Sequence, residues 1–257
     1  MTRLEDSYGP VTARFYDAAY GVSPQLGADV DFYRGLARET GGPVLELGCG
    51  TGRVLLKMAR DGLACTGLDT SQAMLDVARS KASRPAPRWI HAAMQEFDLG
   101  GERFRLIFSA FRAFQHLYSV EEQLRCLARV RVHLAPGGLF AFDVFQPRLE
   151  RLCLDEEPEE EDVRFQHGDE EVVRHARVTR DRAAQLLHVT MRYERWRGGR
   201  VVANEEARFR MRWFHRFELE HLMARAGFDG VRIYGDFDRS PVGRASPAFV
   251  VVASAGG

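Results

Sequence analysis

The chain has 257 residues, enough for one large α/β domain with an insertion or for two small domains. Apolar residues make up 45% of it and aromatic residues 11%, which excludes a disordered or fibrous chain. Its 36 basic residues balance its 36 acidic ones, so the chain lacks the long-range positive field on which most nucleic-acid binders depend.

The four cysteines form no CxxC pair and have no histidine at ligand spacing, so neither a metal site nor a disulfide framework is expected. Free thiols favour a reducing cytoplasm. No apolar leader opens the sequence, and no run of eighteen apolar residues occurs in it. These features predict a soluble cytoplasmic protein with no membrane partner.

Helical and extended patterns alternate through the first part of the chain. Short apolar runs predict strands at residues 44–47, 63–68, 88–92, 104–110 and 139–145. Helical spacing predicts helices at 29–40, 54–62, 71–78 and 119–134. Ser71 is a candidate N-cap, and Ser119 with Glu122 forms a capping box. Because parallel strands need helical crossovers, this order predicts a doubly wound, mostly parallel α/β sheet.

The period changes to two in the later part of the chain. Residues 155–162 are an acidic run interpreted as a solvated linker. Alternating patterns at 172–179, 187–193 and 207–213, with a turn at 197–200, then predict a three-stranded antiparallel meander. A helix at 217–226 and strands at 231–234 and 248–253 are expected to complete a seven-stranded core sheet.

This pattern divides the chain into four parts. Residues 1–40 are expected to be an N-terminal lid or helical segment, and residues 41–150 a Rossmann-like core. Residues 151–215 are expected to be an antiparallel β insertion, and residues 216–257 the C-terminal helix and strand pair.

A glycine-rich turn follows the first strand in the sequence LELGCGTGR. Gly48, Gly50 and Gly52 let the backbone pass close to a ligand, and the next helix begins directly afterwards. A dinucleotide fingerprint needs G-x-G-x-x-G, but Arg53 stands where its third glycine belongs. Glu46 lies within the first strand, and Asp69 ends the second, where a carboxylate can bind both hydroxyls of a ribose.

Together these residues resemble the class I S-adenosylmethionine-dependent methyltransferases, whose E/D-x-G-x-G-x-G hallmark Glu46, Gly48, Gly50 and Gly52 match. The resemblance covers residues 44–144 and the terminal strand pair. It implies that residues 46–52 face the methionine part of S-adenosylmethionine and Asp69 the ribose. The full set of cofactor contacts that it implies is Tyr16, Tyr20, Glu46, Gly48, Cys49, Gly50, Gly52, Arg53, Asp69, Thr70, Met74, Ala93, Met94, Gln95, Ser109, Ala110 and Phe111.

Several of these residues have a simpler interpretation. Asp69 could cap the next helix, Met74 could belong to the core, and Cys49 could be a small buried filler. Tyr16 and Tyr20 could be packing residues. The family often places an acidic residue after the third strand to meet the adenine amino group, whereas this chain has Ala93 there.

Two residues are candidates for the catalytic step. His116 follows the fourth strand at the edge where an acceptor would bind, and Asp143 in the fifth strand is the alternative carboxylate. His116 could instead only pack or cap. An acidic pair plus asparagine typical of metal-dependent catechol methylation is not found, so no metal is expected.

The layout resembles the amino-sugar N-methyltransferases in its N-terminal Tyr16-Asp17 with Tyr20, in His116, and in the insertion at about 163–213. This resemblance implies a lid over the cofactor and an insertion that either caps a small-molecule acceptor or forms a homodimer surface. The function expected is methyl transfer to N or O of a small molecule. A non-catalytic cofactor-binding domain and an NAD(P)-dependent oxidoreductase are the alternatives.

Overall fold

The computed structural model describes residues 8–21 and 27–255. Its helical elements are α1 (Pro10–Gly21), α2 (Ala28–Thr40), α3 (Leu55–Arg60), α4 (Gln72–Lys81), the 3₁₀ turn η2 (Ala113–His116), α5 (Val120–His133), α6 (Leu149–Leu152) and α7 (Arg216–Arg225). Its strands are β1 (Val44–Leu47), β2 (Cys65–Asp69), β3 (Arg88–His91), β4 (Phe104–Ser109), β5 (Leu134–Phe145), β6 (Glu156–His167), β7 (Glu170–Asp181), β8 (Leu186–Arg197), β9 (Arg200–Arg212), β10 (Phe228–Tyr234) and β11 (Ala248–Ala255).

Seven strands form the core sheet in the order β10-β11-β5-β4-β1-β2-β3. The five neighbouring strands β5, β4, β1, β2 and β3 are parallel to one another, whereas β11 is antiparallel to both β5 and β10. The mostly parallel, doubly wound α/β sheet with a terminal strand pair is therefore confirmed. In such a sheet ligands bind at the carboxyl ends of the parallel strands.

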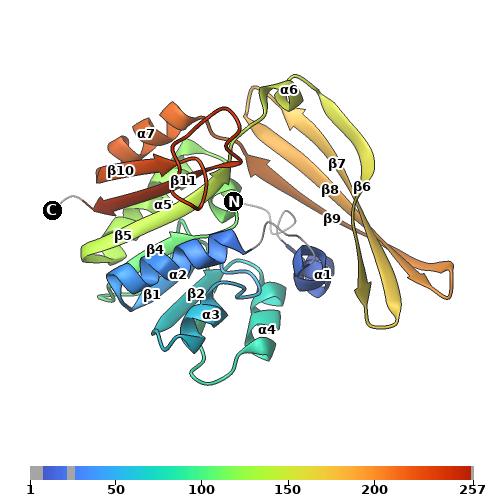
Figure 1. Cartoon of the computed structure of the whole chain (residues 1–257), viewed down its shortest axis with the longest axis horizontal. Coiled ribbons are helices and arrows are strands. Elements are labelled where there is room, and N and C mark those ends of the chain that lie inside the picture. The colour runs from blue at the N-terminus through green and yellow to red at the C-terminus, as the bar shows by residue number, and fades with distance from the viewer. Residues whose placement is uncertain (1–7, 22–26, 256–257) are drawn as a thin grey trace.

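Helices cover both faces of this sheet, as Figure 1 shows. On one face α5 and α7 pack against β5 and β11 through residues such as Leu127, Met223 and Phe140. On the other face α2 and α3 pack against β1 and β4, with Tyr33 and Leu55 fully buried. Both predicted caps form: the Ser71 hydroxyl accepts from Met74 N–H, and Ser119 with Glu122 makes the capping box that begins α5.

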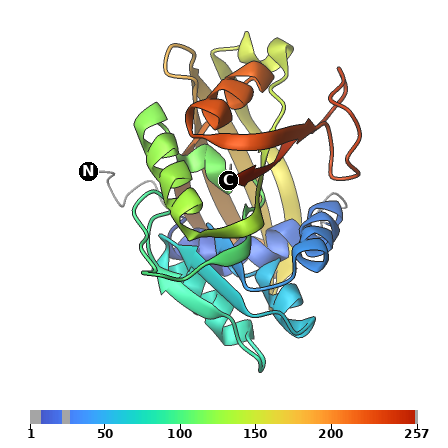
Figure 2. The same cartoon turned by 90° about the vertical axis from the view of Figure 1, so that its left-hand side faces the viewer.

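A second sheet of four antiparallel strands, in the order β6-β7-β8-β9, lies beside the core. Figure 2 shows it behind the core when the molecule is viewed from the core side. The predicted insertion after the fifth strand is confirmed, but it has four strands and not three. The interpretation of residues 155–162 as a solvated linker is wrong, because β6 begins at Glu156.

Ion pairs and one buried side chain explain why this acidic segment forms a strand. Glu156 pairs with Arg177 on β7 at 2.7 Å, and Glu159 pairs with Arg192 on β8 at 2.6 Å. Exposed pairs of this kind contribute about 0–1 kcal/mol each. Further along β6, Phe165 is buried with the apolar face of the sheet, which anchors the strand more firmly.

Helix α1 lies between the two sheets in Figure 1. Phe15 stacks on Tyr193 of β8 with ring centroids 5.2 Å apart, and Ala19 is buried in the same cluster. The apolar face of the four-stranded sheet is therefore covered within the same chain. On its other side, Asp17 of α1 is hydrogen-bonded to Thr51 and Lys81 of the core, so this helix links the core to the second sheet.

Candidate functional site

The glycine-rich turn between β1 and α3 adopts the geometry that its sequence predicts. Gly48, Gly50 and Gly52 all have positive φ, at 72°, 52° and 76°, which favours glycine over other residues. A Cβ on Gly48 would lie 2.7 Å from the Ala113 Cβ, whereas a Cβ on Gly50 would meet no atom within 4 Å. The backbone at Gly50 thus borders open space, and the backbone at Gly48 is packed against η2.

Asp69 lies at the carboxyl end of β2, beside this turn. Its Oδ2 accepts from Gly50 N–H and its Oδ1 accepts from Ser71 N–H, both at 2.8 Å. Burial raises the pKa of the Asp69 carboxyl, and these two backbone donors oppose the rise. Since each carboxylate oxygen has more than one lone pair, both can still accept hydrogen bonds from a ligand. Ser71, and not Asp69, is the N-cap of α4.

Glu46 precedes this turn, in β1, and Arg53 follows it directly. Burial raises the pKa of Glu46 well above its usual value, and the nearby Arg53 guanidinium opposes the rise. Among the described residues, no partner reaches the buried Oε2 of Glu46. Arg53 forms a buried ion pair with Asp29 and lies over the Phe111 ring at 5.0 Å. An unsatisfied carboxylate oxygen beside a guanidinium suits a ligand with both an ammonium and a carboxylate group.

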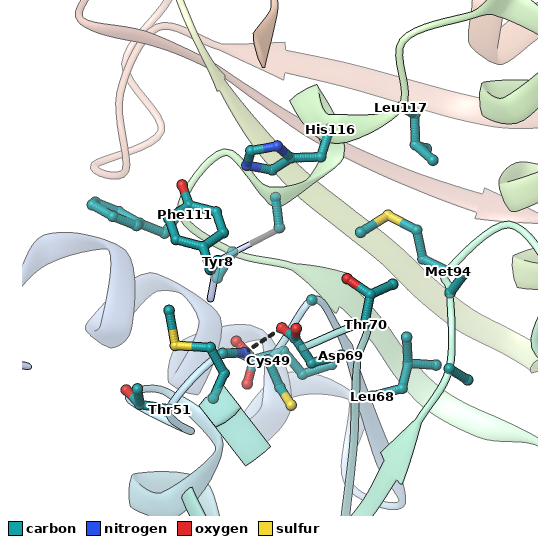
Figure 3. Close-up of a pocket in the computed structure, with 18 of the residues that line it drawn as sticks. Tyr8, Cys49, Thr51, Leu68, Asp69, Thr70, Met94, Phe111, His116 and Leu117 are labelled. Carbon is teal, nitrogen blue, oxygen red and sulfur yellow. Dashed lines mark hydrogen bonds between the residues drawn. The ribbon is translucent and has the colours of Figure 1, made fainter. Parts of the chain in front are cut away.

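These residues border one cavity of about 520 Å³, a size typical of small-molecule sites. Figure 3 shows Asp69 at one end of the cavity and His116 at the other, with Tyr8 and Phe111 between them. The Asp69 end is polar and contains the glycine-rich turn. The His116 end is mostly aromatic, with Tyr8, Tyr16, Phe111 and Tyr118 among its lining residues. One cavity therefore joins two environments that suit two different ligands.

His116 is the last residue of η2, and its imidazole lies close to the Tyr8 ring, with centroids 5.4 Å apart. Burial lowers the pKa of His116 to about 4, and a hydrogen bond to the Arg210 backbone opposes this shift. The imidazole is therefore neutral near pH 7. Because one nitrogen donates to the Arg210 carbonyl, the other nitrogen is an acceptor.

Helix α1 is attached to both the turn and α4 through Asp17. The Thr51 hydroxyl donates to Asp17 Oδ1, and the Lys81 ammonium donates to Asp17 Oδ2, both at 2.6 Å. These contacts place Tyr16, the neighbouring residue, on the cavity wall. Burial raises the pKa of the Tyr16 hydroxyl well above its usual value, so it stays neutral.

The structure brings most of the sequence-predicted residues to this cavity. Its lining includes His116 and the predicted cofactor contacts Tyr16, Glu46, Gly48, Cys49, Gly50, Arg53, Asp69, Thr70, Met74, Ala93, Met94, Gln95, Ala110 and Phe111. Met74 is also 2% exposed and Cys49 4% exposed, so both contribute to the core and to the cavity wall.

Four predicted residues are not part of the lining. Tyr20 lies behind it, in contact with the Tyr16 and Phe111 rings at 4.7 and 5.1 Å. Gly52 packs against Trp89, which would lie 2.7 Å from an added Cβ. Ser109 is fully buried at the end of β4. Asp143 is buried below the turn that carries Phe111, where it accepts hydrogen bonds and does not face the cavity.

Part of the cavity wall was not predicted from the sequence. The unpredicted lining residues are Tyr8, Val54, Leu68, Ala92, Glu96, Leu117 and Tyr118. Tyr118 follows His116 by two positions, a spacing that could have indicated it. No sequence pattern indicates Tyr8, because its place in the cavity wall depends on how the chain before α1 packs against the core.

Comparisons with known proteins agree with this geometry. Residues 44–138 match the methyltransferase domain family. Over 101 residues the chain is 34% identical to N-demethylindolmycin N-methyltransferase of Streptomyces griseus, covering 38% of this chain and 42% of that protein. Over 96 residues it is 32% identical to dTDP-3-amino-3,6-dideoxy-alpha-D-glucopyranose N,N-dimethyltransferase of Streptomyces fradiae, covering 37% of this chain and 36% of that protein. The matched part thus spans about two fifths of these curated relatives.

Solved structures match over nearly the whole chain. The CcbJ methyltransferase of Streptomyces caelestis is similar with a TM-score of 0.82 and 28% identity, covering 98% of this chain and 99% of that one. CalS10, an amino pentose methyltransferase of Micromonospora echinaspora, is similar with a TM-score of 0.69 and 25% identity, covering 91% and 92%. Residues 44–138 therefore match the methyltransferase domain family, and the chain as a whole has the fold of the Rossmann-like methyltransferases to which it is similar.

Proposed function

We propose that this protein is an S-adenosylmethionine-dependent methyltransferase that transfers a methyl group to N or O of a small-molecule acceptor. The observation that carries the proposal is the single cavity that joins the glycine-rich turn and Asp69 to the aromatic end at His116. The relatives named as N-methyltransferases of indolmycin and amino-sugar compounds support a small acceptor. A neutral net charge gives no support to a nucleic-acid acceptor.

The residues at the polar end fit the cofactor. The unsatisfied Oε2 of Glu46 suits the ammonium of its methionine part, and Arg53 suits the carboxylate. Asp69 suits the ribose hydroxyls, and Met74 and Met94 offer apolar contact to the adenine. When bound, S-adenosylmethionine supplies a methyl group already activated by the positive sulfonium.

The protein's main contribution is then to hold the acceptor atom in line and to exclude water. Positioning of this kind can supply roughly 7–11 kcal/mol of the barrier reduction. Tyr8, Tyr16 and Phe111 give the acceptor end its aromatic walls. The hydroxyls of both tyrosines remain neutral, because burial raises the pKa of each well above its usual value.

Calorimetry and turnover assays test this function. We expect S-adenosylhomocysteine to bind with micromolar affinity and the protein to methylate some member of an amine and hydroxyl panel. A non-catalytic domain would bind the nucleoside and methylate nothing in the panel. An oxidoreductase would instead bind NADH, detected as enhanced fluorescence, and would leave S-adenosylhomocysteine unbound; this outcome would end the proposal.

His116 is the proposed general base. A pKa of about 4 makes it neutral and able to accept a proton, but weak in doing so. We therefore expect His116→Asn to lower kcat by about a hundredfold, the low end for general-base catalysis. Steady-state kinetics measure this loss, and His221→Asn on α7 is the control, because His221 is exposed and does not line the cavity. An unchanged kcat in His116→Asn would assign the histidine a packing role only.

Asp17 is expected to hold α1 in its functional place. Asp17→Asn keeps one acceptor oxygen and loses the charge that attracts Lys81. We expect the Kd for S-adenosylhomocysteine to rise by about three- to tenfold, since a part-exposed charged hydrogen bond contributes about 1 kcal/mol. Calorimetry measures the change. Lys81→Met removes the same contact and leaves the Thr51 hydrogen bond in place, so it should give a similar increase, and an unchanged Kd in both variants would contradict a role for this contact in holding α1.

Location and assembly are part of the same proposal. The four cysteines are free, which suits a reducing cytoplasm. No helix among the described residues is long and apolar enough to cross a membrane. A homodimer through the four-stranded sheet stays a prediction, although α1 already covers that sheet's apolar face.

A further inference from the structure

Two consecutive residues after β4 have a backbone conformation that side chains disfavour. Phe111 has φ of 54° and Arg112 has φ of 66°, both in the left-handed region without being glycine. Each such residue is strained, and strain persists only where the surroundings enforce it. Here it occurs where the chain leaves the core sheet and enters η2, which ends at His116. A specific contact must hold this turn.

The contact is made by Asp143, which lies on β5 and is 3% exposed. Phe111 N–H donates to its Oδ1 at 2.8 Å, and Arg112 N–H donates to its Oδ2 at 3.1 Å. The Tyr33 hydroxyl on α2 also donates to Oδ1, at 2.8 Å. Each carboxylate oxygen therefore accepts from one amide of the strained pair, and the Tyr33 hydroxyl on α2 adds a second hydrogen bond to Oδ1.

The position of this turn determines three parts of the cavity. Phe111 carries its ring onto the wall, next to Tyr20 and under the Arg53 guanidinium. Ala113 packs against the glycine-rich turn at Gly48. His116 ends the same short helical turn. A small change in the backbone at 111–112 would move all three, and positioning errors of about 1 Å can cost a hundredfold in rate.

We propose that Asp143 is a positioning residue, whose ionised carboxylate holds the left-handed turn at residues 111–112 and thereby places Phe111 and His116 for the reaction. This replaces the expectation from sequence that Asp143 itself takes a proton from the acceptor. The inference rests on the proposed function for its kinetic consequences only, because the turn and its contacts exist without any ligand.

The charges around Asp143 make this contact sensitive to pH. Burial raises the pKa of Asp143 to about 6; the hydrogen bond from Tyr33 and the Arg112 guanidinium lower it, whereas the Asp29 carboxylate on α2 raises it. Tyr33 is itself kept neutral by burial, with Asp143, Asp29 and Glu46 of β1 all raising its pKa. On β11 the residue paired with Asp143 is the uncharged Val250. Below about pH 6 the carboxyl gains a proton and loses an acceptor site, so the turn is held less firmly.

The first test compares three variants with the wild type by steady-state kinetics. Asp143→Asn keeps the shape but sets an NH₂ group against one of the two amides, so we expect kcat to fall at least tenfold. Combining it with Arg112→Gly relieves the strain at Arg112, and combining it with Arg112→Ala removes the same guanidinium without relief. We expect the glycine double variant to be at least fivefold more active than the alanine one. If Asp143 instead accepted a proton from the acceptor, Arg112→Gly could not restore that role, and the two double variants would be equally active. Equal activities would therefore overturn the proposal.

The second test uses the ligand-free protein and does not depend on its activity. In ¹⁵N NMR spectra we expect the Phe111 and Arg112 amide resonances to titrate together near pH 6. Tyr33→Phe removes a hydrogen bond that lowers the Asp143 pKa, so the shared midpoint should move to higher pH. The proposal would be overturned if the two amide resonances did not titrate between pH 4.5 and 8. It would also be overturned if Tyr33→Phe left their titration midpoint unchanged. If the NMR result holds while no acceptor is methylated, the proposed function has failed and the positioning contact has not.

Discussion

Gly48→Ala is expected to destabilise the ligand-free protein by roughly 2–5 kcal/mol and to abolish measurable cofactor binding. Two penalties add at this position. An alanine at φ of 72° is strained, and its Cβ would lie 2.7 Å from the Ala113 Cβ. Since Ala113 is fixed in η2, neither atom can move without displacing the glycine-rich turn or the segment that carries His116. Chemical denaturation measures the loss of stability, and calorimetry measures the loss of affinity.

Gly50→Ala is the matched control for this prediction. Its φ of 52° brings a similar strain, but an added Cβ meets no atom within 4 Å. Its stability loss should be about 1–2 kcal/mol, the strain alone. Adding Ala113→Gly to Gly48→Ala removes the clashing atom and should recover more than 1 kcal/mol, a coupling typical of residues in contact. If Gly48→Ala and Gly50→Ala lose equal stability, the close approach to Ala113 does not constrain the turn.

The parts that the sequence predicts well are those determined by neighbouring residues. The first strand is a fully buried run, and the five residues that follow it include three glycines, so its limits at Val44 and Leu47 follow from the local pattern. Ser71 and Ser119 begin helices through hydrogen bonds within three residues. The glycine-rich turn and Asp69 could be placed together because parallel strands β1 and β2 end at the same edge.

The parts that the sequence could not predict depend on contacts between distant residues. The strand at Glu156 was interpreted as a linker because its acidic residues lack local partners; Arg177 and Arg192 lie 21 and 33 positions away. Tyr8 reaches the cavity through contacts with distant residues: the Ser71 hydroxyl donates to its carbonyl oxygen, and its ring stacks on Phe209 of β9. Asp143 was interpreted as a catalytic candidate because the sequence alone does not show which way its side chain points. That direction depends on the pairing of β5 with β4 and β11.

Asp69→Ala is expected to raise the Kd for S-adenosylhomocysteine by at least a hundredfold. Asp69 presents two carboxylate oxygens beside the cavity, and each is already oriented by a backbone donor, Gly50 N–H or Ser71 N–H. Two charged hydrogen bonds to a ribose diol would contribute about 3–6 kcal/mol together. Asp76→Ala is the control, because Asp76 is an exposed carboxylate on the next helix that pairs with Arg79 and does not line the cavity. Calorimetry at constant pH and salt measures all three proteins.

A ligand without one hydroxyl separates recognition of the ribose from damage to the turn. Asp69→Ala also removes the acceptor for Gly50 N–H, so some affinity could be lost through the backbone alone. The 2′-deoxy analogue of S-adenosylhomocysteine should bind the wild type more weakly, and Asp69→Ala should then weaken it much less than it weakens the parent compound. Because a coupling between one hydroxyl and one side chain appears only when the two interact, equal losses for both ligands would show that Asp69 orders the glycine-rich turn and does not bind the sugar.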